Sequence, residues 1–169
     1  PALLTSGGKV RIHNNDNVGF TSLTSAFPLL KSADSLQIDN NAHLTNTASS
    51  FNQLAALTGA GTALSITSNP KLVDVPVFAD KMVYSGNQID LYQHFLLTSL
   101  TGWDNIKCTH VDGCELNWLY NYALTEAAVC GAWDGMAGQE GGRKPKKTSY
   151  GCSGGGYRPC YGGTSGNSG

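Results

Sequence analysis

One spacing of apolar residues and asparagine recurs four times in the first hundred residues, and it constrains the fold more than any other feature. In the stretch LQIDNNAHL, Leu36 and Ile38 are two positions apart, so both side chains point to the same side of an extended strand. Asn41 and Leu44 follow at intervals of three residues. With a small residue before each strand, the four copies are Gly7, Val10, Ile12, Asn15 and Val18; Ala33, Leu36, Ile38, Asn41 and Leu44; Gly61, Leu64, Ile66, Asn69 and Leu72; and Gly86, Ile89, Leu91, His94 and Leu97. A repeat of roughly 25–28 residues is the signature of a solenoid.

Each copy predicts one short strand followed by a turn. The two apolar residues of the strand face inward, and stacking the copies side by side buries them beneath a parallel sheet. Because an asparagine amide both donates and accepts hydrogen bonds, we expect Asn15, Asn41 and Asn69 to form a structural ladder that satisfies the turns. The fourth apolar position, from Val18 to Leu97, is expected to point back into the core. The small residue indicates a close approach of neighbouring groups.

The form L-x-L-x-x-N-x-x-L resembles the leucine-rich repeat, and the irregular period is most similar to that of receptor L domains, which occur in the insulin and epidermal growth factor receptors. The resemblance covers residues 7 to about 100. It departs from the leucine-rich repeat at the small position, where leucine is usual, and at His94. The resemblance implies an α/β or β-rich fold, a short right-handed parallel β-solenoid of about four coils, whose sheet face commonly binds a partner. Unrelated strands in a sandwich or barrel are the alternative.

The rest of the chain is expected to form a cap and a tail. Residues 1–107 hold the solenoid repeats, and Trp103 and Ile106 are expected to cover the open edge of the last coil. Residues 108–130 are predicted to form a helical cap, because CELNWLYNYALTEAAVC over 114–130 places apolar residues on one helical stripe. Residues 131–169 form a glycine-rich basic tail, in which GGRKPKK is either a solvated linker or a site for a polyanion such as an acidic glycan.

All five cysteines follow the repeats, which indicates disulfides and an oxidising compartment. They are Cys108, Cys114, Cys130, Cys152 and Cys160. The spacing favours Cys108–Cys114 and Cys152–Cys160 as local pairs without fixing the connectivity, and one cysteine is left over, to stay free or to pair with another chain. Zinc is the alternative at Cys108, His110 and Cys114, but no fourth ligand with suitable spacing and no CxxC pair accompany them, so no metal site is expected.

The composition favours a secreted or assembled protein. Charged residues make up 14% of the chain, against about 25% in typical proteins, and the formal net charge is −1. This low charge argues against nucleic-acid binding by the whole chain. No apolar run approaches the roughly 18 residues that span a bilayer, so no membrane insertion is expected. The chain starts at Pro1 without a signal peptide, which we interpret as a mature form or an excised fragment at an extracellular or cell-surface location.

No motif of a serine hydrolase, a zinc protease, a phosphate-binding loop or a dinucleotide site occurs, so neither a catalytic residue nor a cofactor is expected. Asp39 and Asp90 are the acidic pair of most interest. Strands two coils apart would separate their backbones by roughly 10 Å, which is near the carboxylate separation of inverting glycosidases. No aromatic sugar platform flanks them in sequence, so an enzyme acting on polysaccharide is a minor alternative.

The outer face of the predicted sheet is the expected binding surface. Its outward side chains are Arg11, His13, Gln37, Asp39, Ser65, Thr67, Asp90 and Tyr92. A polar, flat and extended face suits contacts with a protein or a glycan better than a small-molecule pocket. The sequence therefore predicts a non-catalytic extracellular module that binds a protein partner, or assembles with copies of itself into an oligomer or filament. A glycan-binding module that uses Tyr84, Tyr92 and the basic tail is a further interpretation.

Overall fold

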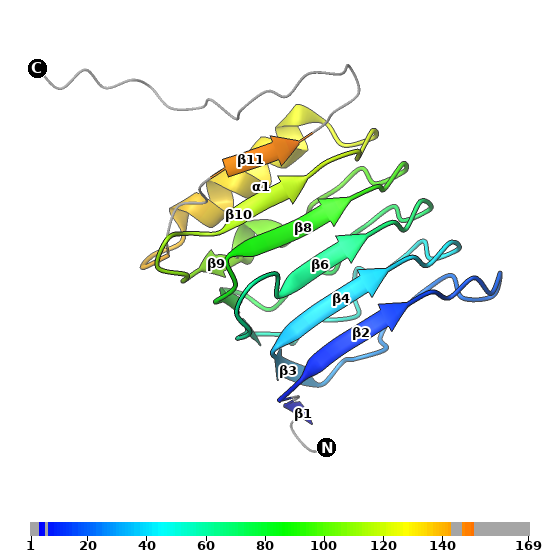
Figure 1. The fold of residues 1–169 in the computed structure, drawn as a ribbon, viewed down its shortest axis with the longest axis horizontal. Coiled ribbons are helices and arrows are strands. Elements are labelled where there is room, and N and C mark those ends of the chain that lie inside the picture. Colours follow the sequence, from blue (N-terminus) through cyan, green and yellow to red (C-terminus); the bar gives the residue numbers. More distant parts are fainter. Residues whose placement is uncertain (1–3, 6, 143–146, 151–169) are drawn as a thin grey trace, which may run out of the picture.

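The computed structural model describes residues 4–5, 7–142 and 147–150. The chain winds between two parallel sheets (Figure 1). The front sheet has the order β11-β10-β8-β6-β4-β2, with β2 (Lys9–His13), β4 (Ser35–Asp39), β6 (Leu64–Thr67), β8 (Gln88–Tyr92), β10 (Glu115–Trp118) and β11 (Lys147–Tyr150). The return sheet has the order β1-β3-β5-β7-β9, with β1 (Leu4–Thr5), β3 (Leu30–Ala33), β5 (Ala56–Leu57), β7 (Val83–Tyr84) and β9 (Lys107–Cys108). The predicted short parallel β-solenoid of about four turns is confirmed.

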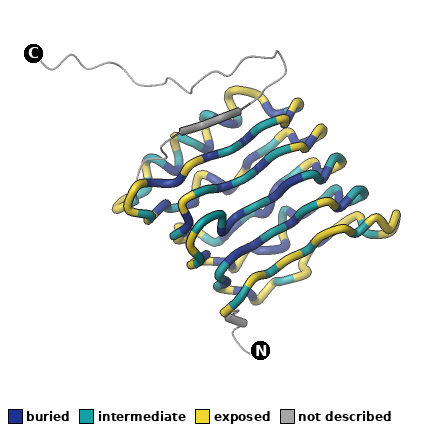
Figure 2. The backbone as a smooth tube through the Cα atoms, in the orientation of Figure 1, coloured by how far each residue is buried: buried dark blue, intermediate teal, exposed yellow. Residues whose placement is uncertain are grey.

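The apolar positions of the repeats lie opposite one another along the stack, as predicted. Leu36 of β4 is paired with Leu64 of β6, and Leu64 with Ile89 of β8. All three side chains are fully buried. Figure 2 shows buried stretches along the strands of the front sheet in dark blue. The fourth apolar position is buried in three coils, at Leu44, Leu72 and Leu97. The repeat therefore fills the core by placing like residues on like residues in successive coils.

The first coil departs from this pattern. Val10 and Ile12 are only half-buried, although they pack against the core. Val18 is 75% exposed, so the prediction that it points into the core is wrong. The physical reason is position, because β2 is the last strand of the front sheet and no coil stacks on its outer side within the described residues.

The asparagines form the predicted ladder. The Asn15 side chain donates from Nδ2 to Oδ1 of Asn41 at 2.8 Å, and Asn41 in turn donates from Nδ2 to Oδ1 of Asn69 at 3.0 Å. Asn41 Nδ2 also lies 3.1 Å from the carbonyl oxygen of Ile12 in the preceding coil. Asn41 and Asn69 are fully buried. Each amide therefore satisfies main-chain groups that would otherwise be buried without partners.

A histidine occupies the ladder position of the fourth coil. His94 Nε2 lies 3.0 Å from the carbonyl oxygen of Ile66, and Nδ1 lies 3.1 Å from that of Asn69. Its main-chain N–H donates to Asn121 Oδ1 at 3.2 Å. Burial lowers the pKa of His94 and outweighs the two carbonyl contacts, which raise it. Because a neutral imidazole carries one N–H, one of these carbonyls faces a ring nitrogen without a proton.

A fifth copy of the repeat follows the first four, and it replaces the first part of the predicted helix. Its members are Gly113, Leu116, Trp118, Asn121 and Leu124. Leu116 of β10 is paired with Ile89 of β8, so this segment continues the front sheet instead of turning into a helix. The prediction of a helix over 114–130 is therefore wrong in position. The open edge of β8 and the burial of Leu116 and Trp118 outweigh the helical spacing of the stretch.

The C-terminal helix is α1 (Glu126–Gly138), which begins where the Thr125 side chain accepts a hydrogen bond from the main-chain N–H of Ala128. It packs against η1 (Trp103–Asn105) and β9. Trp103 and Ile106 are fully buried, and Trp103 donates from Nε1 to the carbonyl oxygen of Pro76 at 3.0 Å. Because β9 and β10 follow them and Trp103 packs against Trp118, they lie within the stack and do not cover its open edge. No helix within the described residues has the length and apolar character needed to cross a bilayer.

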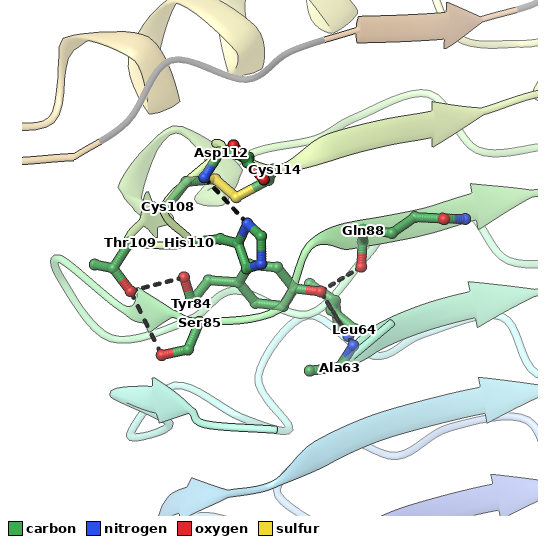
Figure 3. The surroundings of a disulfide bond; sticks show 10 residues. All are labelled: Ala63, Leu64, Tyr84, Ser85, Gln88, Cys108, Thr109, His110, Asp112 and Cys114. Atoms are coloured by element: carbon green, nitrogen blue, oxygen red, sulfur yellow. Dashed lines mark hydrogen bonds between the residues drawn. A yellow bond between two sulfur atoms is a disulfide. The ribbon is translucent and has the colours of Figure 1, made fainter. Parts of the chain in front are cut away.

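The predicted disulfide Cys108–Cys114 is confirmed, and it joins the end of β9 to the start of β10 (Figure 3). Cys130 is disulfide-bonded as well. The predicted pair Cys152–Cys160 and most of the basic tail lie outside the described residues. Within the predicted tail, residues 131–138 belong to α1 and β11 is paired with β10, so this region is not a linker throughout.

Candidate functional site: the outer face of the front sheet

The strand register arranges the outward side chains in the middle of the front sheet in two rows, and Lys9 lies two residues before Arg11 on β2. Row one contains Arg11, Gln37, Ser65, Asp90 and Asn117. Row two contains His13, Asp39, Thr67 and Tyr92. The eight residues predicted for the binding surface therefore lie on one face, and the structure adds Asn117, which the sequence analysis missed. The fifth copy of the repeat could have predicted this position, because Asn117 lies between the inward residues Leu116 and Trp118.

Asp39 is the least satisfied charged group of this face. Its Oδ2 lies 3.2 Å from a guanidinium nitrogen of Arg11, and the exposed fractions of the two side chains are 17% for Asp39 and 51% for Arg11. Its Oδ1 is buried and has no hydrogen-bond partner among the described residues. A buried acceptor without a donor costs free energy, and such atoms are rare in folded proteins. The carboxylate therefore retains one unused acceptor on the face.

Asp90, in contrast, lies in a closed network. Its Oδ1 accepts from Gln88 Nε2 at 2.6 Å and from Asn117 Nδ2 at 3.2 Å. These bonds fix the carboxylate between β8 and β10. Asp90 therefore contributes a fixed negative charge to row one.

The members of the face differ in accessibility. Arg11 and His13, on the edge strand, are exposed, whereas Asp39 and Tyr92 are half-buried. Thr67 is only 7% exposed, because it lies between the side chains of its neighbours in row two. Thr67 therefore offers little contact area to a partner.

The register also separates the two aspartates further than predicted. Asp39 lies opposite Thr67 and, one strand further, Tyr92, so Asp90 belongs to the neighbouring row. Two strand spacings and one two-residue step along the strand place their backbones about 12 Å apart. Inverting glycosidases hold their carboxyl groups about 6.5–9.5 Å apart with room for one water. The geometric argument for a polysaccharide-cleaving pair is weaker in the structure than in the sequence.

Tyr84 is not available to a glycan. Its side chain is fully buried in the return sheet, and its hydroxyl donates to the carbonyl oxygen of Gln88 and accepts from the main-chain nitrogens of Ala63 and Leu64 at 3.1 and 3.3 Å (Figure 3). Burial raises the pKa of this phenol. A Cβ on Gly86 would overlap the same hydroxyl, which explains the small residue at this point of the repeat.

An exposed aromatic cluster lies on the turns of the last two coils. Phe95 and Tyr122 are stacked with ring centroids 5.7 Å apart, and Tyr120 lies 6.5 Å from Tyr122. All three side chains are about half exposed. Tyr120 also has a φ of 59°, which is uncommon for a bulky residue. The sequence analysis missed this cluster, although Phe95 and Tyr122 each follow a ladder residue directly.

The zinc alternative at Cys108, His110 and Cys114 is wrong, because the disulfide uses both sulfurs. His110 Nδ1 instead accepts a hydrogen bond from the main-chain N–H of Asp112 at 3.3 Å (Figure 3). In the part of the chain that the structure describes, no three residues among histidine, cysteine, aspartate and glutamate gather closely enough to hold a metal ion.

Comparisons with known protein families, with curated proteins and with solved structures found no match to this chain. The likeness of its repeat to receptor L domains therefore stays a prediction made from sequence.

Proposed function

We propose that the protein is a non-catalytic extracellular module that binds a protein partner, or a second copy of itself, through the outer face of the front sheet. The observation that carries this proposal is Asp39. Among the described residues, its Oδ1 is a buried acceptor without a donor, whereas Oδ1 of Asp90 on the same face accepts two hydrogen bonds. If the carboxylate of Asp39 turns outward on binding, a partner that supplies an N–H or O–H donor to this oxygen removes an energetic cost of the free protein, and that gain favours the bound state.

The surroundings of Asp39 fit a protein partner. Tyr92, in the same row, offers an aromatic surface with a polar tip, a combination enriched at interfaces. Arg11 holds the other carboxylate oxygen and so keeps Asp39 oriented. Strands spaced by about 4.8 Å make the five strands from β2 to β10 a platform about 19 Å wide, which suits an extended contact.

The extracellular location is part of the same proposal. The disulfide Cys108–Cys114 and the disulfide-bonded Cys130 favour an oxidising compartment, where such bonds persist. The low fraction of charged residues, 14%, agrees with a secreted or assembled protein.

A double variant, Asp39→Lys with Tyr92→Ala, tests the face. Sedimentation velocity measures self-association, and an array of extracellular proteins measures partner capture. The proposal predicts that the double variant loses association or capture while its melting temperature stays near that of the wild type. The matched control is Asp80→Lys, the same charge change at an exposed residue outside the face. If the double variant binds normally and deletion of residues 141–169 abolishes binding, the tail carries the interaction and the proposal is wrong.

Glycan binding is the second candidate, and the exposed aromatic cluster supports it. Phe95, Tyr120 and Tyr122 present apolar ring surface beside phenol groups, and this combination suits the C–H faces and hydroxyls of a sugar. A glycan array probed with the wild type and with Tyr122→Ala would test it. Binding that disappears in the variant would favour this candidate over the protein partner.

A further inference from the structure

Within the described residues, β2 is the last strand of the front sheet and has no strand on its outer side. β2 pairs only with β4, and the order of the sheet ends at β2. The main-chain N–H of Asn14 donates to the carbonyl of Asp39 in β4. Since main-chain groups in a parallel strand alternate between its two sides, those of Lys9, Arg11 and His13 face away from β4. The His13 carbonyl already accepts from Asn15 Nδ2 at 3.2 Å, so the groups of Lys9 and Arg11 form the main template for one more strand.

The core beneath this edge is incomplete. Val10 and Ile12 are half-buried, whereas Leu36 and Ile38, their partners in β4, are fully buried. Val18, in the same coil, is 75% exposed. One further strand with apolar inward side chains would complete the burial that every later coil of the solenoid already has.

The ladder is incomplete at the same edge. The side-chain oxygens of Asn41 and Asn69 accept hydrogen bonds from the preceding ladder residue, and that of Asn121 accepts from His94. Within the described residues, Asn15 Oδ1 has no corresponding donor. The main chain of β2, the apolar core and the ladder therefore all lack a neighbouring coil at the β2 end of the described stack.

The charge of β2 indicates which kind of segment can pair with it. The outward side chains of β2 are Lys9, Arg11 and His13, all of them basic types. In an antiparallel pair, opposite residues lie on the same face, so any two-fold pairing of β2 with a second copy sets basic side chains against basic side chains, which is unfavourable. Arg11 already binds the carboxylate of Asp39 from the neighbouring strand β4, which shows how a carboxylate fits beside it.

We propose that β2 binds an extended segment of a partner protein in which acidic residues alternate with apolar ones. The segment adds to the sheet as a strand, with its acidic side chains beside Lys9 and Arg11 and its apolar side chains over Val10 and Ile12. Arg11 belongs to both surfaces, but this inference does not depend on the proposed role of Asp39 and Tyr92, because it rests on the main chain, the half-buried apolar residues and the charge of β2.

The test uses a short synthetic peptide that alternates glutamate with valine, with its dissociation constant measured by fluorescence anisotropy on the intact protein. The variant Lys9→Glu/Arg11→Gln avoids placing a new carboxylate beside Asp39. We expect it to weaken binding about tenfold, the size expected for two exposed charge pairs. A peptide that alternates lysine with valine should bind the variant more tightly than it binds the wild type. Tyr92→Ala, on the face, should leave peptide binding unchanged.

Strand addition has a separate control. Placing proline in the middle of the peptide removes a main-chain donor and should abolish binding. Two results would overturn the proposal: equal affinity of the wild type and the charge variant for the glutamate peptide, or undiminished binding of the proline-containing peptide. Failure of the wild type to bind the glutamate peptide at all would also overturn it, and the basic residues would then serve only to protect an open edge.

Discussion

Asn41→Ala removes the side chain that connects three coils. Its Nδ2 lies 3.1 Å from the carbonyl oxygen of Ile12 and 3.0 Å from Asn69 Oδ1, and its Oδ1 accepts from Asn15 Nδ2 at 2.8 Å. The alanine variant leaves the Ile12 carbonyl and the Asn15 amide without these partners. A net loss of two to three hydrogen bonds costs about 2–3 kcal/mol of the free energy of unfolding. For a chain of this size, that lowers the melting temperature by about 5–10 °C.

Asn41→Asp separates hydrogen bonding from side-chain volume. Aspartate has nearly the same shape, but a carboxylate cannot donate to the carbonyl oxygens of Ile12 and Asp39. We therefore expect a larger loss of stability than for Asn41→Ala, measured by thermal and urea unfolding at neutral pH. Asn52→Ala, at an exposed turn position, is the matched control and should unfold like the wild type. If Asn41→Ala also unfolds like the wild type, the ladder does not hold the coils together.

Three further predictions follow from the buried groups. Because burial lowers the pKa of His94, the unfolded chain binds its proton at a higher pH than the native protein, so stability falls as the pH drops from about 7 to 5. His94→Asn should reduce this pH dependence of the free energy of unfolding, measured by urea titration at several pH values. An unchanged pH dependence in the variant would contradict the prediction. Gly86→Ala should lower the melting temperature markedly, because its Cβ would collide with the Tyr84 hydroxyl and with the carbonyl oxygen of Gly61 in the neighbouring coil. Gly7→Ala, at the same repeat position, meets no described atom within 4 Å and should be nearly neutral. Equal changes in melting temperature would refute this account of the small residue. The variant Cys108→Ser/Cys114→Ser should lose about 2 kcal/mol of stability by equilibrium unfolding, and no loss would show that the disulfide is dispensable for folding.

The front sheet could be predicted from sequence because the same residue types recur at each coil, and stacking requires like positions to meet. Leu36, Leu64 and Ile89 form one such column. The fifth copy was missed because Leu116 and Trp118 also fit a helical stripe, and only the open edge of β8 decides between the two. The return sheet has strands as short as Ala56–Leu57, and two residues show no periodicity.

The site could be predicted only in part. Strand alternation places Asp39 and Asp90 on the outer face. Their offset could also be predicted, because Asp39 follows Ile38 whereas Asp90 lies between Ile89 and Leu91, but the sequence analysis overlooked it. The burial of Thr67 depends on its neighbours in adjacent coils. The exposure of Val18 could not be predicted either, because the repeat pattern does not indicate which coil lies at the end of the stack.

The most direct test of the proposed binding face compares two single charge reversals, Asp39→Lys on the face and Asp80→Lys outside it. The measurement is the dissociation constant of each variant for the partners that the wild type captures, or for its own dimer. The proposal predicts that Asp80→Lys keeps the affinity of the wild type, whereas Asp39→Lys weakens it by tenfold or more, about the effect of removing one hydrogen bond to a charged group. Equal affinities for the two variants would contradict the claim that Asp39 lies at the centre of the interaction.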